Sequence, residues 1–349
     1  MYSTPSAQDF AYQNEILQGV SRTFALTIPQ LPEKLRCVVG NAYLLCRIAD
    51  TVEDEATLTT KQKCYFADQF IQVVEGVETA ETFANELFPL LSDQTLEAER
   101  DLVRNTDRVI RITQNYNDTQ KKALARCVRI MVKGMADYQE KETLTGLPDQ
   151  AAMDDYCYYV AGVVGEMLAQ LFCDYSEEIN RHHDELMDLS VSFGQGLQMT
   201  NILKDIWDDQ ESGACWLPQE TFSKYGFDLT ELKPGSNNAE FQQGLGELLG
   251  IARGHLENAL KYTLLIPAHE KGIRKFCLWA IGMAILTLKK INNNRNFSHS
   301  DQVKISRRTV KITIFLTSAF VSNDTSLKLL FHSTAKGLPV NNIHEKIMT

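Results

Sequence analysis

The feature that most constrains this chain of 349 residues is its set of long proline-free segments with apolar residues at helical spacing. In residues 35–49 apolar side chains recur every three or four positions, and residues 159–171 repeat the pattern. Such spacing gives each segment one apolar stripe, as an α-helix requires. The sequence has no run of alternating Val, Ile and Thr between hairpin turns, and no Gly-x-Gly-x-x-Gly unit of the dinucleotide-binding type. It therefore predicts an all-α fold.

Four polar, turn-rich joints interrupt the helical pattern, at residues 141–150, 210–219, 232–239 and 291–302. None is long or biased enough to be a domain linker. We therefore expect one domain over residues 1–349, with the joints as loops between long helices.

Charge and apolar content narrow the function classes. Lys and Arg number 35 against 45 Asp and Glu, a net charge of −10 without a cationic block, which argues against nucleic-acid binding. A small anionic substrate remains compatible, because a metal ion can supply positive charge locally. The eight cysteines form no Cys-x-x-Cys pair, and the apolar runs 276–286 and 312–321 are shorter than the ~20 residues that span a bilayer. We expect a cytoplasmic protein without a transmembrane segment. Peripheral contact with a membrane is left open.

Two acidic clusters share the pattern Asp-x-x-(Asp/Glu)-Asp, at residues 50–54 and 205–209. On a helix the first, fourth and fifth positions lie on one face, so each cluster projects three carboxylates together. The flanking residues are apolar, and partly buried carboxylates are costly unless they are paired or metal-bound. Taken alone, each acidic cluster is also compatible with a solvent-exposed helix face, or with carboxylates that pair with cations such as Arg47 and Lys204. Two matched clusters favour a Mg²⁺–diphosphate site built from facing helices.

These segments, with several others, resemble the squalene/phytoene synthase family, and its squalene synthases most closely. The segments that carry the resemblance are Ser21–Phe24, Tyr43–Asp54, Tyr156–Gly165, Gln198–Asp209, Trp216–Pro218, Asn292–Asn294 and Val303–Ile305. They extend over about residues 20–310. The resemblance implies a single-domain isoprenoid-synthase helical fold with a central active-site cavity.

The resemblance also implies an activity. It is the Mg²⁺-dependent, head-to-head condensation of two farnesyl diphosphates through presqualene diphosphate, followed by reduction to squalene with NADPH. A related synthase that forms presqualene diphosphate, dehydrosqualene or phytoene is the near alternative. A non-catalytic helical assembly factor is the alternative from another class, and it is disfavoured because both acidic clusters are complete.

The family motifs assign roles by position. The implied metal ligands are Asp50, Glu53, Asp54, Asn201, Asp205 and Asp209. The implied substrate-binding residues are Ser21, Arg22, Phe24, Tyr43, Arg47, Gln198 and Lys204. Tyr156 matches the family tyrosine near the reacting centre, where it acts with Asp50, Asp54, Asp205 and Asp209. The residues implied to bind NADPH are Asn294, Lys304, Arg307 and Arg308. For the cations Arg22, Arg47 and Lys204, the alternative role is ion pairing with the carboxylates beside them. For Tyr156, the alternative is a structural position in the core.

Three positions depart from the family pattern. Ala214 and Ser306 stand where family members commonly have basic residues, and Lys204 replaces an Arg, which removes bidentate geometry. These changes weigh against the NADPH-dependent reduction and leave the expected condensation unaffected. Gly162 and Gly165 lie inside a helical pattern at a cost of about 1 kcal/mol each relative to alanine. Either a helix wall thinned for a prenyl chain or close helix packing would account for them.

Overall fold

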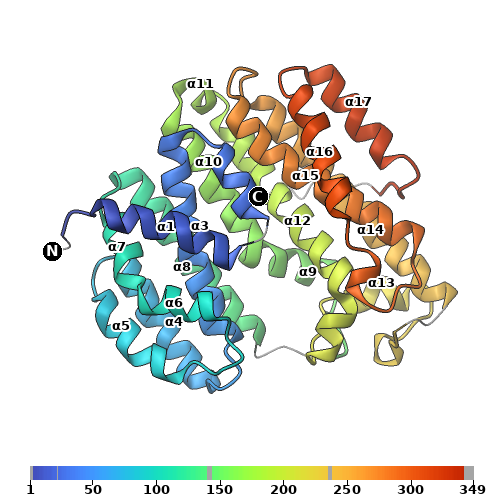
Figure 1. The fold of residues 1–349 in the computed structure, drawn as a ribbon. Coiled ribbons are helices and arrows are strands. Elements are labelled where there is room, and N and C mark those ends of the chain that lie inside the picture. Colours follow the sequence, from blue (N-terminus) through green and yellow to red (C-terminus); the bar gives the residue numbers. More distant parts are fainter. Residues whose placement is uncertain (1–2, 22, 140–143, 235–237, 342–349) are drawn as a thin grey trace. The chain divides into compact units, whose positions relative to one another are not determined.

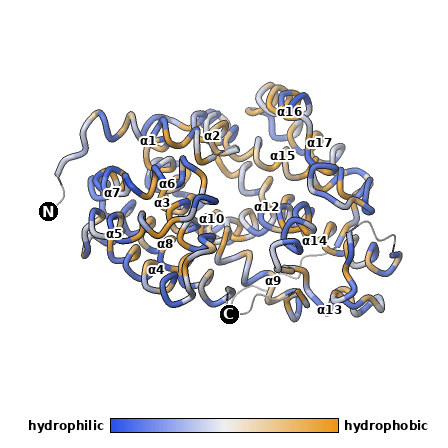
Figure 2. The backbone as a smooth tube through the Cα atoms, turned by 60° about the horizontal axis from the view of Figure 1, so that its bottom comes forward, coloured by the Kyte–Doolittle hydropathy of each residue, from blue (hydrophilic) through white to orange (hydrophobic). Residues whose placement is uncertain are grey.

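The structure, a computed structural model, describes residues 3–21, 23–139, 144–234 and 238–341 (Figure 1). Within these ranges the regular elements are helices, and the only β-type pairing is an isolated bridge between Leu147 and Pro218. The all-α prediction is confirmed. Hydrophilic and apolar stretches follow one another along the helices, as the periodicity predicts (Figure 2).

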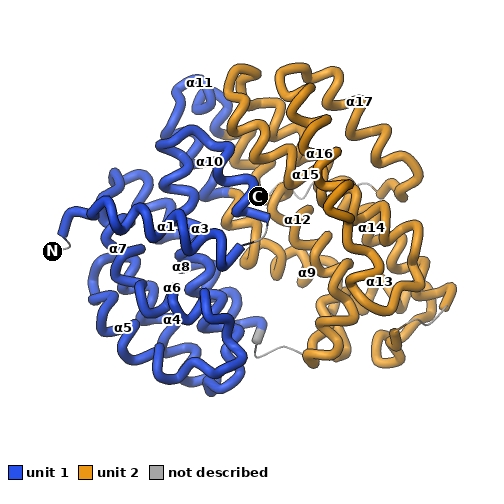
Figure 3. The backbone as a smooth tube through the Cα atoms, in the orientation of Figure 1, with its two compact units in different colours: residues 1–139, 166–183 blue, residues 140–165, 184–349 orange. Residues whose placement is uncertain are grey.

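The chain divides into two compact units that exchange segments: residues 1–139 with 166–183, and residues 140–165 with 184–349 (Figure 3). One boundary falls inside the helix Val163–Tyr175, so a continuous helix runs from one unit into the other. The single domain over residues 1–349 stays a prediction.

Unit 1 holds the first acidic cluster. Its helices are α1 (Ala7–Val20), α2 (Phe24–Thr27), η1 (Ile28–Gln30), α3 (Glu33–Asp54), α4 (Thr60–Val74), α5 (Ala80–Leu87), η2 (Phe88–Leu90), α6 (Glu97–Arg104), α7 (Thr106–Gln114), α8 (Asp118–Gln139), most of α10 (Val163–Tyr175), and α11 (Glu177–Asn180). Helix α3 begins at Glu33, directly after Pro32, because proline has no backbone N–H to donate and interrupts a helix that would extend to its N-terminal side. The helix buries Leu35, Leu45 and Ile48 almost completely. This apolar stripe fixes the rotation of the helix that carries Asp50 and Asp54.

A buried polar network fixes the position of α3 between α1 and α7. The Asn41 side chain donates to Gln13 Oε1 at 3.2 Å and to the Val109 carbonyl at 3.0 Å, and accepts from Thr113 Oγ1 at 2.8 Å. Both donor positions of this fully buried amide and its carbonyl oxygen are engaged by neighbouring helices, so the network specifies one arrangement.

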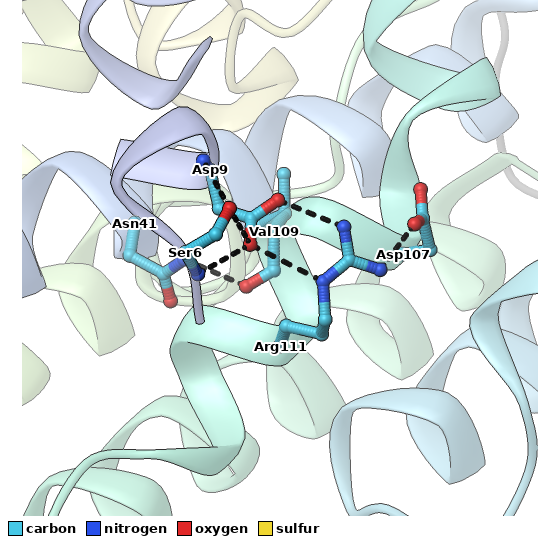
Figure 4. A network of polar contacts seen from close by, with 6 residues as sticks. All are labelled: Ser6, Asp9, Asn41, Asp107, Val109 and Arg111. Atoms are coloured by element: carbon cyan, nitrogen blue, oxygen red, sulfur yellow. Dashed lines mark hydrogen bonds and ion pairs between the residues drawn. The ribbon is translucent and has the colours of Figure 1, made fainter. Parts of the chain in front are cut away.

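Beside this network, an ion pair joins the start of α1 to α7 (Figure 4). Arg111 contacts Asp9 Oδ1 at 2.8 Å and also pairs with Asp107. Asp9 in turn forms a capping box with Ser6. The hydrogen bond from Arg111 is the main reason that the pKa of Asp9 falls to about 2. The N-terminal helix is therefore tied to the same frame as α3.

Unit 2 holds the second acidic cluster. Its elements are α9 (Gln150–Cys157), the π-helical η3 (Tyr158–Gly162), the start of α10, most of α12 (His183–Glu211), α13 (Gln219–Ser223), η4 (Leu229–Glu231), α14 (Ala239–Leu265), α15 (Lys271–Asn293), η5 (Ser300–Gln302), α16 (Arg307–Ala319) and α17 (Asp324–Ala335). The buried Arg274 side chain, 2% exposed, donates to the carbonyls of Ile266 at 2.8 Å and Val321 at 3.1 Å and pairs with Asp324 at 2.6 Å. It thereby ties the end of α14 and the α16–α17 connection to α15.

Glycines allow the central helix segment to approach α12 closely. A Cβ on Gly165 would lie 2.2 Å from the Ser190 carbonyl oxygen, and one on Gly194 would lie 2.3 Å from that of Ala161. Real Cβ atoms do not approach backbone atoms so closely, which means that both helices need glycine at this crossing. Of the two explanations for Gly165, close helix packing is the one that the structure supports.

One stretch, residues 150–175, is long and apolar enough to cross a membrane by length and composition alone, with a mean hydropathy of 1.2 over its best window. Forty-four per cent of its most apolar part is buried within the protein, and core helices of soluble proteins can have the same length and composition. The stretch carries Cys157 and Val163, both fully buried. The absence of a transmembrane segment and a cytoplasmic location stay predictions.

Candidate active site

The first acidic cluster occupies the last turns of α3, where Arg47 lies between two carboxylates. Its Nη1 is 3.8 Å from Asp50 Oδ2 and 3.6 Å from Glu99 Oε1, and its Nη2 donates to the Tyr43 hydroxyl at 3.1 Å. Arg47 and Asp50 are each 27% exposed at the side chain. One guanidinium thus serves two half-buried carboxylates, and neither contact has the short bidentate geometry of a strong pair.

Residues of the first family segment surround this cation. The Tyr43 hydroxyl donates to the Val20 carbonyl at 2.9 Å, and the Tyr43 ring lies 5.2 Å from that of Phe24. Ser21 Oγ accepts from the backbone N–H groups of Phe24 at 3.0 Å and Ala25 at 3.3 Å, which starts α2. The structure therefore brings together Ser21, Phe24, Tyr43, Arg47 and Asp50. Arg22 lies outside the described residues.

The electrostatics of this cluster favour an additional cation. Burial raises the pKa of Asp50 to about 7 against the opposing effect of Arg47, and the neighbouring charges of Asp54 and Glu99 raise it further. Burial likewise raises the pKa of Glu99. The carboxylates of Asp50, Asp54 and Glu99 share the charge of Arg47, and Lys63 acts on Asp54 as well, so three acidic groups face two cations. Full ionisation is therefore favoured by further positive charge.

Glu53 lies in a different environment from Asp50. It lines a small, largely apolar cavity of about 20 Å³, between α3, α4 and α8, with room for about one water molecule. Its backbone carbonyl accepts a hydrogen bond from Lys63. In the first cluster the structure thus places the Asp50 carboxylate beside Arg47 and the Glu53 backbone beside Lys63. Burial raises the pKa of Asp54, and the charges of Arg47 and Lys63 lower it.

The second acidic cluster lies near the C-terminal end of α12. Lys204 Nζ is 3.0 Å from Asp205 Oδ2 and 3.4 Å from Asn201 Oδ1. Burial raises the pKa of Asp205, and Asp208 raises it further, whereas Lys204 and Lys304 lower it. Like Asp50, Asp205 is thus a half-buried carboxylate with a neighbouring cation and a pKa above its ordinary value. Asp209, one turn further on, is half-buried, and its carbonyl accepts from the buried Ala214 N–H at 2.9 Å.

A hydrogen bond joins this cluster to the segment that precedes α16. Ser300 Oγ donates to Asp208 Oδ2 at 2.7 Å. Lys304 Nζ donates to Asp301 Oδ1 at 2.6 Å, and its charge reaches Asp205. The structure therefore brings one predicted NADPH-binding residue, Lys304, close to a predicted metal ligand.

The remaining residues predicted to bind NADPH are exposed. Ser306 caps α16 by accepting from the Thr309 N–H at 3.1 Å, which explains a serine at this position. Arg307 and Arg308 occupy the first turn of α16, where the helix dipole disfavours positive charge unless an anion is bound. Asn294 ends α15.

Tyr156 and Gln198 both lie half-buried in unit 2, on α9 and α12. The Tyr156 ring stacks on Trp216, with centroids 4.1 Å apart and planes 5° from parallel. The turn of π-helix directly after α9 shifts the register of the central helix, and such turns are frequent at functional sites.

The donor set fits a hard divalent cation. Mg²⁺ commonly takes one or two carboxylates, with water and substrate phosphate completing its octahedron. Aspartates 50 and 205 offer such carboxylates with raised pKa values. Within the described ranges no group of three or more His, Cys, Asp or Glu side chains forms a closed metal cage, an arrangement that Mg²⁺–diphosphate does not need.

Sequence reasoning missed three features of this site. Glu99 on α6 contacts Arg47 across 52 residues of sequence, Ser300 contacts Asp208, and the π-helical turn follows Tyr156. Of the three, only the π-helical turn has a signal in the sequence, which is Gly162, a glycine within a helical pattern. No local pattern indicates the other two, because neither contact falls within one helix.

Comparisons with known proteins identify the family of this chain. A sequence model of the family described as squalene/phytoene synthase matches residues 17–309. Squalene synthase of Eremothecium gossypii is 30% identical over 308 residues, which cover 88% of this chain and 67% of the relative. Squalene synthase BSS of Botryococcus braunii is 32% identical, and the match covers 83% of this chain and 60% of that relative. The squalene synthase of Nicotiana benthamiana is 31% identical, and the match covers 93% of this chain and 72% of that relative.

Solved structures show the same fold. The complex of TcSQS with the ligand E5700 has a TM-score of 0.73 at 24% identity, and covers 95% of this chain and 92% of that one. A dehydrosqualene synthase in complex with a ligand has a TM-score of 0.64 at 21% identity, and the match covers 90% of this chain and 96% of that one. The family match covers both acidic clusters and the central tyrosine segment. This chain is therefore a member of the squalene/phytoene synthase family.

Proposed function

We propose that this chain is a squalene synthase. It condenses two molecules of farnesyl diphosphate head to head through presqualene diphosphate and reduces the product to squalene with NADPH. Family membership supports a prenyltransferase, and the curated relatives above carry the name squalene synthase. The observation that carries the proposal is the matched pair of half-buried aspartates, Asp50 and Asp205, each with a raised pKa and a neighbouring cation in a family motif.

Both acidic clusters are proposed to bind Mg²⁺ and diphosphate. The ligands would be drawn from Asp50, Glu53, Asp54, Asn201, Asp205 and Asp209. When bound, Mg²⁺ supplies Lewis-acid neutralisation of the diphosphate as it leaves. Arg47 and Lys204 are proposed to hold phosphate oxygens. The hydrogen bond from Arg47 to Tyr43 and the contact with Glu99 orient the Arg47 guanidinium in advance of substrate.

Departure of the diphosphate leaves an allylic cation that must be shielded from water. The neighbouring rings of Phe24 and Tyr43 have π-faces that attract a positive charge electrostatically and form no covalent bond with it. Tyr156 is proposed to hold or transfer a proton at its hydroxyl oxygen, with its ring plane fixed by the Trp216 indole. Gln198 is proposed to contact the second prenyl substrate.

The reductive step is proposed to use Asn294, Lys304, Arg307 and Arg308 for NADPH. Support comes from the exposed cations in the first turn of α16 and from the link between Lys304 and the second acidic cluster. Phosphate groups bind well at helix N-termini that carry such side chains.

A product assay tests the proposal. The purified chain is incubated with farnesyl diphosphate and Mg²⁺, with and without NADPH, and its products are identified by mass spectrometry. Squalene that forms only with NADPH is the expected result. Presqualene diphosphate or dehydrosqualene formed regardless of NADPH would remove the reductive step, and phytoene from a longer substrate would change the chain length. A folded protein without any product would favour the assembly-factor alternative.

Variants separate the metal-binding role from folding. Asp50→Asn combined with Asp54→Asn is expected to abolish turnover and to remove the thermal stabilisation that Mg²⁺ with inorganic pyrophosphate confers on the wild type. Asp68→Asn, which neutralises an exposed carboxylate on α4, is the matched control and should retain both. Turnover by the double variant would refute the metal role of the first cluster.

A further inference from the structure

Helix α16 has the reverse of the polarity expected for a surface helix. Its buried face is centred on Thr313 and Thr317, which are 8% and 6% exposed. Its bulky apolar side chains point outward: Phe315 is 70% exposed and Ile312 48%. A helix on the surface of a globular protein ordinarily buries such side chains against the core.

Close packing against α15 explains the inner face. A Cβ on Gly282 of α15 would lie 2.5 Å from Thr313 Cγ2, so the two helices meet where only small groups fit. The Thr313 hydroxyl donates to the Thr309 carbonyl at 2.9 Å and that of Thr317 to the Thr313 carbonyl at 2.7 Å. With their hydroxyls satisfied inside their own helix, the threonines present methyl groups to α15. This contact has no space for Phe315 or Ile312.

The outer face combines apolar and basic residues. Arg308, Ile312, Phe315 and Ala319 follow one another at steps of four, three and four residues, and Lys311 lies three residues after Arg308 and four before Phe315; all five are exposed. Phe320, 40% exposed, continues the apolar surface at the end of the helix. We call this set the α16 face. The helix lies at the margin of its unit (Figure 2).

The charge of this region is opposite to that of the whole chain. Residues 303–323 contain four cations, Lys304, Arg307, Arg308 and Lys311, and no Asp or Glu, whereas the chain carries −10. Among the described residues, no ion pair neutralises Arg307, Arg308 or Lys311. Exposed aromatic and aliphatic side chains beside unpaired cations are complementary to an anionic lipid surface, where the apolar groups enter the acyl boundary and the cations meet headgroups.

We propose that the α16 face docks this protein onto anionic membranes as an interfacial helix. The occupant is a bilayer surface with negatively charged headgroups, and Phe315 and Ile312 are the side chains that enter it. Arg308 belongs both to this face and to the proposed NADPH site, but the three side chains that the test changes, Lys311, Ile312 and Phe315, have no role in the catalytic proposal, so the two can fail separately.

Vesicle flotation tests the inference. The wild-type chain is expected to float with phosphatidylcholine vesicles that contain phosphatidylglycerol and to remain behind with phosphatidylcholine alone. Added salt should weaken the binding, because it screens the cations. Lys311→Glu should reduce the partition coefficient at least about five-fold, the effect expected for one basic residue at such a surface. Ile312→Ser combined with Phe315→Ser should abolish flotation.

Two controls keep the outcome decisive. Val77→Ser removes an equally exposed apolar side chain from unit 1, and it should float like the wild type. Thermal melting confirms that each variant is folded, since Ile312 and Phe315 contribute little buried area. Equal flotation of wild type and the Ile312/Phe315 variant would overturn the inference, as would failure of the wild type to bind anionic vesicles.

Two other uses of the α16 face predict different results. If the face joins two copies of the chain, the wild type is a dimer in light scattering without vesicles, the Ile312/Phe315 variant is a monomer, and the inference is overturned. If the cations serve only a soluble phosphate ligand, Lys311→Glu weakens binding of inorganic pyrophosphate while neither Lys311→Glu nor the Ile312/Phe315 variant differs from the wild type in flotation, which also overturns the inference.

Discussion

At the scale of single residues, Asp50 and Asp205 pose a conflict between stability and the proposed function. Each keeps a carboxylate in a half-buried position, where burial makes ionisation unfavourable and the neighbouring cations only partly oppose it. A chain selected only for stability would replace such a group with a neutral one. The cost is useful if a divalent cation occupies the site during turnover, because the raised pKa reflects unsatisfied demand for positive charge.

This conflict gives a pH-dependent prediction for Asp50→Asn. The ordinary aspartate pKa is ~3.9, and the folded value is about 7. Between these values the folded chain holds a proton that the unfolded chain has released, so the cost of Asp50 grows as pH rises and is complete above about pH 7. Without Mg²⁺, Asp50→Asn should therefore raise the free energy of unfolding by roughly 1–3 kcal/mol at pH 8 and change it little at pH 4. Denaturant unfolding at both pH values measures this, and a destabilised variant at pH 8 would contradict it.

At the scale of elements, the helices are placed by contacts between backbones and between buried polar groups. Asn41 and its partners hold α3, and the glycines at positions 165 and 194 let the central segment cross α12 with backbones in contact. The same principle gives α16 its threonine inner face against Gly282. Small residues at crossings thus decide which face of each helix is left to carry function.

Gly165→Ala tests this account of the helix crossing. The added Cβ would overlap the Ser190 carbonyl, so the helices must separate, at an expected cost of about 1–3 kcal/mol in the free energy of unfolding. Gly40→Ala is the matched control, because its Cβ would lie 3.4 Å from Gln13 Nε2 and 4.0 Å from Ile28 Cγ2, which are ordinary contact distances. There the better helix propensity of alanine should leave stability unchanged or raise it by up to about 1 kcal/mol. Thermal and denaturant melting distinguish the two, and equal stabilities would argue against a backbone contact at Gly165.

At the scale of the whole molecule, buried titratable groups set how the fold responds to acid. His255 on α14 is 3% exposed and its Nδ1 lies 2.8 Å from Ser192 Oγ. Its buried Nε2 has no hydrogen-bond partner among the residues that the structure describes. Burial lowers the pKa of this imidazole to about 4. The unfolded chain therefore takes up this proton first as pH falls. The associated stability is complete above about pH 6.5 and is lost as pH approaches 4.

His255→Gln should flatten this part of the pH profile. The wild type is expected to lose about 3 kcal/mol of unfolding free energy through this group between pH 6.5 and pH 4. The variant, which can still hydrogen-bond Ser192 but cannot be protonated, should lose less over the same interval. His182→Gln, at an exposed position, is the control. Melting temperatures measured across this interval test the prediction, and parallel profiles for wild type and His255→Gln would refute it.

The sequence by itself determined the helical class, the two acidic clusters and the family. Periodicity and motif spacing are local properties that need no knowledge of packing, which is why α3 and α12 and the family motifs could be predicted. Only the tertiary structure decided what lies beside each motif residue: Glu99 against Arg47, Trp216 on Tyr156, Ser300 against Asp208, and threonines rather than Phe315 inside α16. These contacts join residues on different elements. The sequence spacing within one helix carries no information about which neighbour its side chains meet, so packing must decide it.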